Sequence, residues 1–226
     1  QPALNYKGTM WSPGYSYEYF GGNATYAIIP PEVMELGCLL EYKGDSFFEA
    51  SLAEPISCSI GAFHSCYHTI ANTYEHVMGT KQKGKLALLA GGGPMGLGAV
   101  DYALNCDNPP SLLVVTDLDA GRIDRLSKLF PKEKYAARGI QVAFLQTGKE
   151  EDAVKQLMEL SPEGYDDVFV YAPVQGLVRA ASDILGRDGC MNFFAGPTDP
   201  EFSGQVNLYD VHYNRTHVLG STGGNL

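Results

Sequence analysis

Residues 86–98, LALLAGGGPMGLG, decide the fold, because an apolar run leads there directly into a glycine-rich loop. The run is long enough for a buried strand, and Pro94 then stands where a helix can begin without wasting an N–H group. We therefore predict a strand, a tight turn and a helix over residues 94–105. The glycines at the spacing G-x-G-x-x-G are Gly91, Gly93 and Gly96.

The same alternation of short apolar runs and helical stretches continues from residue 85 to the end of the chain. The expected strands lie at residues 86–90, 112–116, 140–145, 167–171, 190–194 and 217–219. The expected helices cover residues 94–105, 120–130, 150–160 and 175–185. Nearly continuous apolar strands separated by helices indicate a parallel sheet that is buried on both faces. Six such strands are the number that two mononucleotide-binding halves contain, so we predict a doubly wound α/β fold of the Rossmann type.

The pattern upstream of residue 80 is less regular. Residues 1–24 are rich in Gly, Tyr, Ser and Pro, and they predict a loop. His64 and His68 are four residues apart, but no third metal ligand is recognisable, which favours structural histidines. The elements expected here are a strand over residues 24–29, a short helix from residue 45 or 46 to 53, and a longer helix over 55–77.

Composition excludes several classes of protein. The 226 residues are 45% apolar and 19% charged, which is a globular balance. A net charge of −10 without a basic patch argues against nucleic-acid binding, and no apolar run is long enough for a membrane span. Five scattered cysteines without a Cys-x-x-Cys pair favour a reducing, cytoplasmic location. Because the chain begins at Gln1, we expect it to be part of a longer protein.

In its strand–turn–helix context the glycine loop predicts a dinucleotide-binding site rather than a merely flexible turn. Gly91 permits the tight turn, Gly93 lets the backbone approach a diphosphate, and Gly96 allows the helix to pack closely on the strand. Pro94 and Met95 open the helix, whose free N–H groups and positive dipole end attract the diphosphate.

Asp117 follows the second predicted strand, close to the spacing expected for a residue that binds the adenosine ribose. A carboxylate there accepts hydrogen bonds from both ribose hydroxyls and repels a 2′-phosphate, so NAD is favoured over NADP. One alternative is that Asp117 or Asp119 merely caps the next helix. Arg122 could accept a phosphate, pair with a nearby acid or flank the adenine.

Five short motifs, spread over nearly the whole chain, stand in an order typical of one enzyme family. They are Gly21–Tyr26, Leu52–Pro55, Gly91–Gly96, Val115–Leu118 and Gly220–Asn225. Together they resemble the medium-chain dehydrogenase/reductase family, in its zinc-dependent polyol dehydrogenase branch. The stretch Asp188–Pro197 further resembles the L-sorbose-1-phosphate reductase subgroup.

The resemblance implies two domains. Residues 1–54 would be the end of a GroES-like β-barrel domain, and residues 55–226 an NAD-binding Rossmann domain. Glu54 resembles a glutamate that the family places at or beside its catalytic zinc, although a carboxylate at a helix start is the alternative. The family's other zinc ligands have no counterpart here. We therefore expect zinc only in a longer protein, and we expect this chain alone to be inactive.

The resemblance also assigns residues to the two halves of the cofactor site. In the family, backbone after the fourth, fifth and sixth strands meets the nicotinamide half, at the strand ends where open α/β sheets bind ligands. Leu118 and Arg122 join Asp117 on the adenosine side. The candidates on the nicotinamide side are Ala172, Pro173, Ala195, Gly196 and Ser221.

The activity implied by the resemblance is hydride transfer between NAD(H) and the secondary alcohol or ketone of a polyol, sugar or sugar phosphate. Zinc would polarise the substrate oxygen, and the protein would form a homo-oligomer. Two alternatives stay open. One is a zinc-free, NADPH-dependent reductase of the same superfamily, and the other is a module that binds the nucleotide without turnover.

Overall fold

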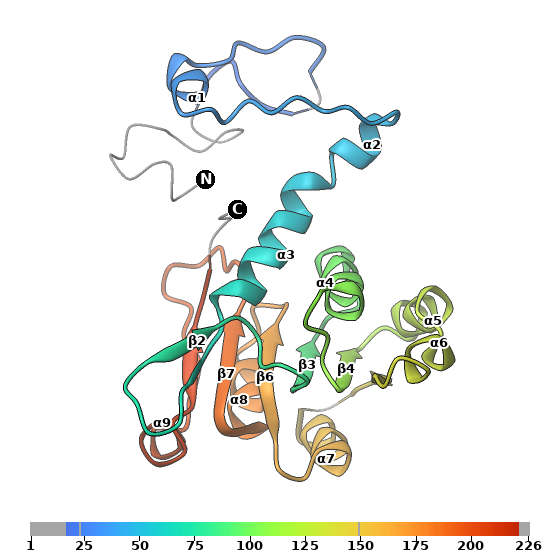
Figure 1. Cartoon of the computed structure of the whole chain (residues 1–226), viewed down its shortest axis with the longest axis vertical. Helices are drawn as coiled ribbons and strands as arrows, with labels where there is room; N and C mark the ends of the chain where they lie inside the picture. Colours follow the sequence, from blue (N-terminus) through green and yellow to red (C-terminus); the bar gives the residue numbers. More distant parts are fainter. Residues whose placement is uncertain (1–16, 23, 149, 222–226) are drawn as a thin grey trace.

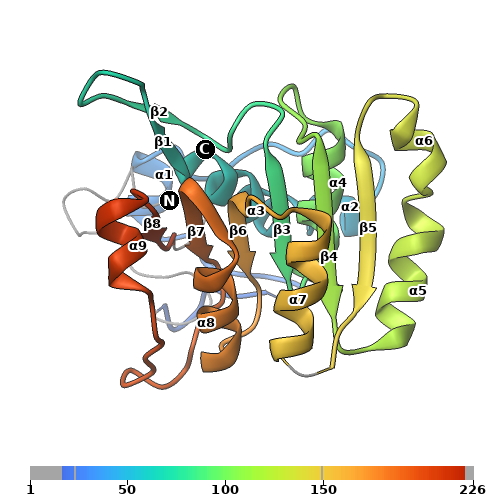
Figure 2. The same ribbon diagram turned by 90° about the horizontal axis from the view of Figure 1, so that it is seen from below.

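The computed structural model describes residues 17–22, 24–148 and 150–221, and it contains a six-stranded sheet with helices on both faces (Figures 1 and 2). Every neighbouring pair of its strands is parallel, in the order β5-β4-β3-β6-β7-β8. This is the order 3-2-1-4-5-6 of a doubly wound dinucleotide-binding fold, so the predicted fold class is confirmed. The strands are β3 (Lys85–Leu89), β4 (Leu112–Asp117), β5 (Gln141–Gln146), β6 (Tyr165–Val170), β7 (Leu185–Phe193) and β8 (His217–Leu219).

Two helical layers explain why the strands are apolar without interruption. Leu86 and Leu88 of β3 point into the core beneath the first layer, whereas Ala87 and Leu89 point into the core beneath the second. The first layer contains α3 (Ala53–Ser65), α4 (Pro94–Asn105), α5 (Ala120–Leu129) and α6 (Lys132–Ala136). The second contains α7 (Glu150–Leu160) and α8 (Gln175–Asp183), as Figure 2 shows. A short helix, α9 (Leu208–Tyr213), precedes β8.

The predicted helix over residues 55–77 is wrong beyond residue 65. Helix α3 ends at Ser65, and an antiparallel hairpin follows, formed by β1 (Tyr67–Thr69) and β2 (His76–Met78). His64 and His68 therefore do not share a helix face. Contacts with distant parts of the chain hold the hairpin: Asp188 accepts hydrogen bonds from the backbone N–H of Thr69 and from its hydroxyl.

His68 is buried in β1 between two acceptors. Its Nε2 lies 3.1 Å from Asp167 Oδ1, and its Nδ1 lies 2.9 Å from the carbonyl oxygen of Asp188. Because both partners accept, both ring nitrogens donate and the ring is an imidazolium. Burial disfavours that charge, but the hydrogen bond to Asp167, the negative charge of Asp167 and the hydrogen bond to the carbonyl of Asp188 together outweigh burial and raise the pKa of His68 to about 9.

The strand predicted over residues 24–29 is also wrong. Within the described part of residues 17–52, the only regular elements are α1 (Pro31–Glu35) and α2 (Phe47–Ala50). The short helix expected up to residue 53 is therefore limited to α2. Helix α3 projects from the sheet toward this segment, as Figure 1 shows. The loop predicted over residues 1–16 lies outside the described residues, and a GroES-like origin of residues 1–54 stays a prediction.

Other differences from the prediction are small. Helix α8 ends at Asp183 and β7 already begins at Leu185, whereas we expected residues 185 and 190 for these two boundaries. Helices α6 and α9 were not predicted, because elements of five and six residues are too short to show a helical period. Among the described residues, no helix combines the length and the apolar character needed to span a membrane.

Candidate functional site

The predicted cofactor residues after β3 gather with those after β4 and β6, at the carboxyl ends of the strands. Strands β3 and β6 are neighbours, although their connections lead to opposite halves of the sheet. The glycine loop follows β3, Asp117 is the last residue of β4, and Ala172 follows β6 by two residues. In open α/β sheets, ligands bind in the crevice at such a switch point.

The glycine loop packs so tightly that side chains are excluded at three of its positions, Gly91, Gly92 and Gly96. A Cβ on Gly96 would overlap the carbonyl group of Gly91, and it would lie 2.7 Å from the Cα of that residue. A Cβ on Gly91 would lie 2.9 Å from Cγ1 of Val115. At Gly93, by contrast, a Cβ would meet nothing within 4 Å. The loop is therefore closed toward the sheet and open at Gly93.

Helix α4 begins at this opening. Gly93 is its N-cap, no side chain caps it, and the N–H of Leu97 makes the first helical hydrogen bond, to Gly93 O. The N–H groups of Met95 and Gly96 precede that bond, and such groups have no partner within a helix. Pro94 is exposed and Met95 is half-buried. An open space beside a positive helix end fits an anionic group such as a diphosphate.

Asp117 holds the glycine loop against β4. Its side chain is 4% exposed, and its Oδ2 accepts a hydrogen bond of 3.0 Å from the N–H of Gly92. Its Oδ1 accepts from the N–H of Asp119, and Arg122 Nη1 lies 3.5 Å from Oδ2. A carboxylate has about four lone-pair sites, so it retains capacity for ribose hydroxyls.

Of the two acids considered for helix capping, Asp119 caps α5. Its hydrogen bond from the N–H of Arg122 lowers the pKa of Asp119.

A pocket of about 360 Å³ opens beside the loop. Four of the predicted residues line it: Asp117, Leu118, Arg122 and Ala172. Residues that the sequence did not assign to the site also line this pocket, among them Ala90, Thr147, Gly148, Val174 and Leu177. Several of these residues follow the ends of β3, β5 and β6, so the rule that ligands bind at strand ends could have found them.

The candidates for the nicotinamide side follow β6, β7 and β8. Ala172, Ala195 and Ser221 are half-buried, whereas Pro173 and Gly196 are exposed. The N–H of Ala195 donates to the carbonyl of Val170, so the segment after β7 is fixed beside the end of β6. The end of the motif Gly220–Asn225, from residue 222 onward, lies outside the described residues, as does Asn23 of the motif Gly21–Tyr26.

Glu54 is not among the residues that line this pocket. It is exposed in the first turn of α3, and its Oε1 accepts a hydrogen bond of 3.0 Å from the thiol of Cys58. In the part of the chain that the structure describes, one group of three metal-binding side chains is present, and it does not include Glu54. The described residues therefore do not form a zinc site around Glu54, because zinc needs about four ligands.

Comparison with known proteins relates the chain to sugar-phosphate enzymes. No family model matches it. It is 52% identical over 225 residues to mannitol-1-phosphate 5-dehydrogenase of Aliivibrio fischeri, covering 99% of this chain and 53% of that protein. It is 46% identical over 214 residues to L-sorbose 1-phosphate reductase of Klebsiella pneumoniae, covering 94% and 51%. The chain thus spans about half the length of the curated relatives it matches.

Solved structures share the fold at low sequence identity. 2R,3R-butanediol dehydrogenase from Bacillus subtilis has a TM-score of 0.55 at 18% identity, covering 79% of this chain and 43% of that one. A protein of Sinorhizobium meliloti 1021, described as a zinc-binding dehydrogenase and solved with NADP bound, has a TM-score of 0.54 at 18% identity, covering 77% and 44%. The resemblance to L-sorbose 1-phosphate reductase is thus confirmed in the sequence, and these solved dehydrogenases share the fold of the chain.

Proposed function

We propose that this chain is the NAD(H)-binding part of an oxidoreductase that acts on the secondary alcohol or ketone of a polyol, sugar or sugar phosphate. One observation carries the proposal: a chain homologous to sugar-phosphate dehydrogenases places an open glycine loop, between β3 and α4, beside the carboxylate of Asp117. The nicotinamide, when bound, supplies the hydride exchange.

The diphosphate would be held by backbone groups alone. The space at Gly93 accommodates it, and the N–H groups of Met95 and Gly96 point along the axis of α4 toward that space. Pro94 has no N–H to compete for the anion. Because these donors belong to a helix packed on the sheet, they keep their positions when the ligand arrives.

The adenosine would occupy the pocket beside the loop. Asp117 would accept hydrogen bonds from the ribose hydroxyls, while Leu118, Val174 and Leu177 offer apolar surface to the base. The nicotinamide half would extend in the other direction, past the backbone after β6, β7 and β8. Ala172, Pro173, Ala195, Gly196 and Ser221 remain the candidates for contacts with it.

Zinc stays an expectation that comes from the resemblance. Glu54 belongs to no group of three potential metal ligands among the described residues, so further ligands would have to come from outside the described part of the chain. We expect the 226-residue chain to bind the nucleotide without turnover. A full-length protein that bound NADH but reduced no sugar phosphate would favour the non-catalytic module.

The choice between NAD and NADP depends on Asp117 and Arg122. We expect Asp117→Asn to weaken NADH binding by about tenfold, because the amide loses one charge-assisted bond to the ribose and turns an N–H toward the loop. Arg122→Gln should leave NADH affinity within about twofold, since the guanidinium pairs with Asp117 at 3.5 Å and is half exposed. Both are measured by titrating nucleotide fluorescence.

A parallel titration with NADPH tests which of the two nucleotides the chain prefers. Wild-type chain should bind NADPH more weakly than NADH, and Asp117→Asn should narrow that difference. A wild-type preference for NADPH that is lost in Arg122→Gln would instead assign Arg122 to a 2′-phosphate and support the NADPH-dependent reductase.

A cytoplasmic location remains an expectation from the cysteine pattern.

We also propose a homo-oligomer formed through the free edge of β8. This strand ends the sheet, and exposed apolar side chains surround it. They are Leu208, Tyr209, Val211, Tyr213 and Val218. We expect Val218→Lys to shift the chain toward monomer in sedimentation velocity, because a charge on an edge strand opposes pairing. Val77→Lys is the control, since Val77 is exposed on β2. A monomeric wild-type chain would contradict the proposal.

A further inference from the structure

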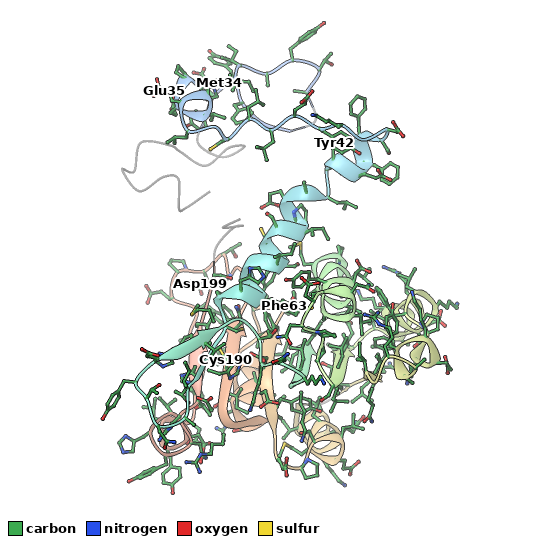
Figure 3. The ribbon with its side chains drawn as sticks, viewed as in Figure 1. Met34, Glu35, Tyr42, Phe63, Cys190 and Asp199 are labelled. Carbon is green, nitrogen blue, oxygen red and sulfur yellow. The ribbon has the colours of Figure 1, made fainter. Side chains whose placement is uncertain are left out.

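A cluster of two thiols and one carboxylate lies within the core, on the side of the sheet covered by α3. The donor atoms of Cys66, Asp167 and Cys190 all lie within 4.8 Å of one another, and no member of the cluster is more than 2% exposed. Asp167 and Cys190 are register partners on β6 and β7, and Cys66 is the C-cap residue that directly follows α3. Figure 3 labels Cys190 on the sheet and Phe63 on α3, and both residues belong to the same buried core cluster.

The carboxylate of this cluster is held in place by groups around it. Asp167 Oδ2 accepts a hydrogen bond of 2.8 Å from the N–H of Lys81, and Oδ1 lies 3.1 Å from the imidazolium of His68. His68 is fixed in turn by the carbonyl of Asp188. Metal ligands are commonly oriented by hydrogen-bonded neighbours of this kind.

Two buried oxygens near the cluster have no hydrogen-bond partner among the described residues. They are Oδ1 of Asn192 and the hydroxyl of Tyr171. Asn192 lies two residues after Cys190, and its amide nitrogen donates to the carbonyl of Ala62 in α3. Tyr171 packs against the same core cluster that contains Cys66 and Cys190. Buried polar atoms are normally satisfied, so these two indicate an absent partner.

We infer that Cys66, Asp167 and Cys190 bind one thiophilic divalent cation, with Zn²⁺ as the ion to test. Two thiolates and a carboxylate are a ligand set that zinc accepts at about 2.0–2.3 Å, which in a tetrahedral site puts the ligand atoms about 3.5–3.8 Å apart. The three donor atoms lie within 4.8 Å of one another, so binding requires an inward shift of at most about 1 Å. Three protein ligands leave a fourth position for water, and Asn192 and Tyr171 offer that water its hydrogen-bond partners.

Binding releases the two thiol protons to solvent and changes no oxidation state. The ion would join the end of α3 to β6 and β7, apart from both the glycine loop and Glu54.

The test is to measure metal bound to the 226-residue chain. After equilibration with Zn²⁺ and removal of free ion, native mass spectrometry and elemental analysis should give about one zinc per chain. Cys66→Ser and Cys190→Ser should each lose it. Cys106→Ser makes the same chemical change outside the cluster and should retain it, as should Glu54→Gln, which leaves all three donors in place.

A measurement on the wild-type chain covers the case in which the serine variants do not fold. Zinc should protect Cys66 and Cys190, but not Cys106, from alkylation in mild denaturant, mapped by peptide mass spectrometry. Co²⁺ in place of zinc should give thiolate-to-metal charge-transfer absorption. A folded wild-type chain that takes up no zinc would overturn the inference. So would zinc that both serine variants keep, or zinc that only Glu54→Gln loses.

Discussion

Gly93→Val is expected to abolish NADH binding and to leave the fold intact. A Cβ at Gly93 meets nothing within 4 Å, and the extended backbone there, with φ −77°, is open to any residue, so we expect the fold to tolerate the side chain. It would, however, fill the space at the start of α4 where the diphosphate is proposed to lie. We expect at least about a hundredfold weaker affinity, or roughly 3 kcal/mol. Titration of NADH fluorescence measures the affinity, and circular dichroism verifies the fold.

Gly22→Val is the matched control for this substitution. Its Cβ also meets nothing within 4 Å, and Gly22 lies in the segment before α1, outside the proposed site. It should bind NADH as the wild type does. A folded Gly93→Val variant with undiminished NADH affinity would show that the diphosphate does not lie at this loop.

Gly96→Ala is expected to cause the largest loss of stability, about 3 kcal/mol or more. The added methyl group would overlap the carbonyl of Gly91, and backbone cannot rotate away as a side chain can. Alanine also favours a helix over glycine by about 1 kcal/mol, so the steric cost has to exceed that gain. The free energy of unfolding in urea measures the effect.

Gly98→Ala is the control that separates the destabilising overlap expected at Gly96 from the gain in helix propensity. This glycine lies on α4 as well, but its Cβ would come 3.1 Å from Cδ1 of Ile56, the end of a flexible side chain. The variant should be as stable as the wild type or slightly more stable. If Gly96→Ala and Gly98→Ala unfolded at the same urea concentration, the close approach of α4 to the loop would be refuted.

The sheet was predictable because its signals are local. Leu86 to Leu89 are apolar at consecutive positions, which is typical of a strand covered on both faces, and the two core clusters receive them alternately. The glycine loop was predictable for the same reason. The spacing of Gly91 and Gly96 reflects a contact between residues five positions apart.

The hairpin after α3 was not predictable, because its stabilising partners are distant in sequence. His68 contacts Asp167 and the backbone of Asp188, 99 and 120 residues away. Without those partners, the segment continues the apolar spacing of α3. The same reasoning applies to Cys66, Asp167 and Cys190, which three separate segments bring together.

At Asp117, the sequence indicated the residue but not every contact that its side chain makes. The spacing predicted a ribose ligand, which stays a prediction. The structure adds that the carboxylate accepts a hydrogen bond from Gly92, a contact that no spacing rule reports.

That contact has a thermodynamic consequence. The N–H of Gly92 is tied to Asp117, and that of Gly91 to the carbonyl of Thr116, before any nucleotide arrives. The turn is thus preorganised, and little conformational entropy is lost when a ligand docks against it. Weakening this link would make the apo turn more mobile, and the association equilibrium would then include the cost of ordering it again.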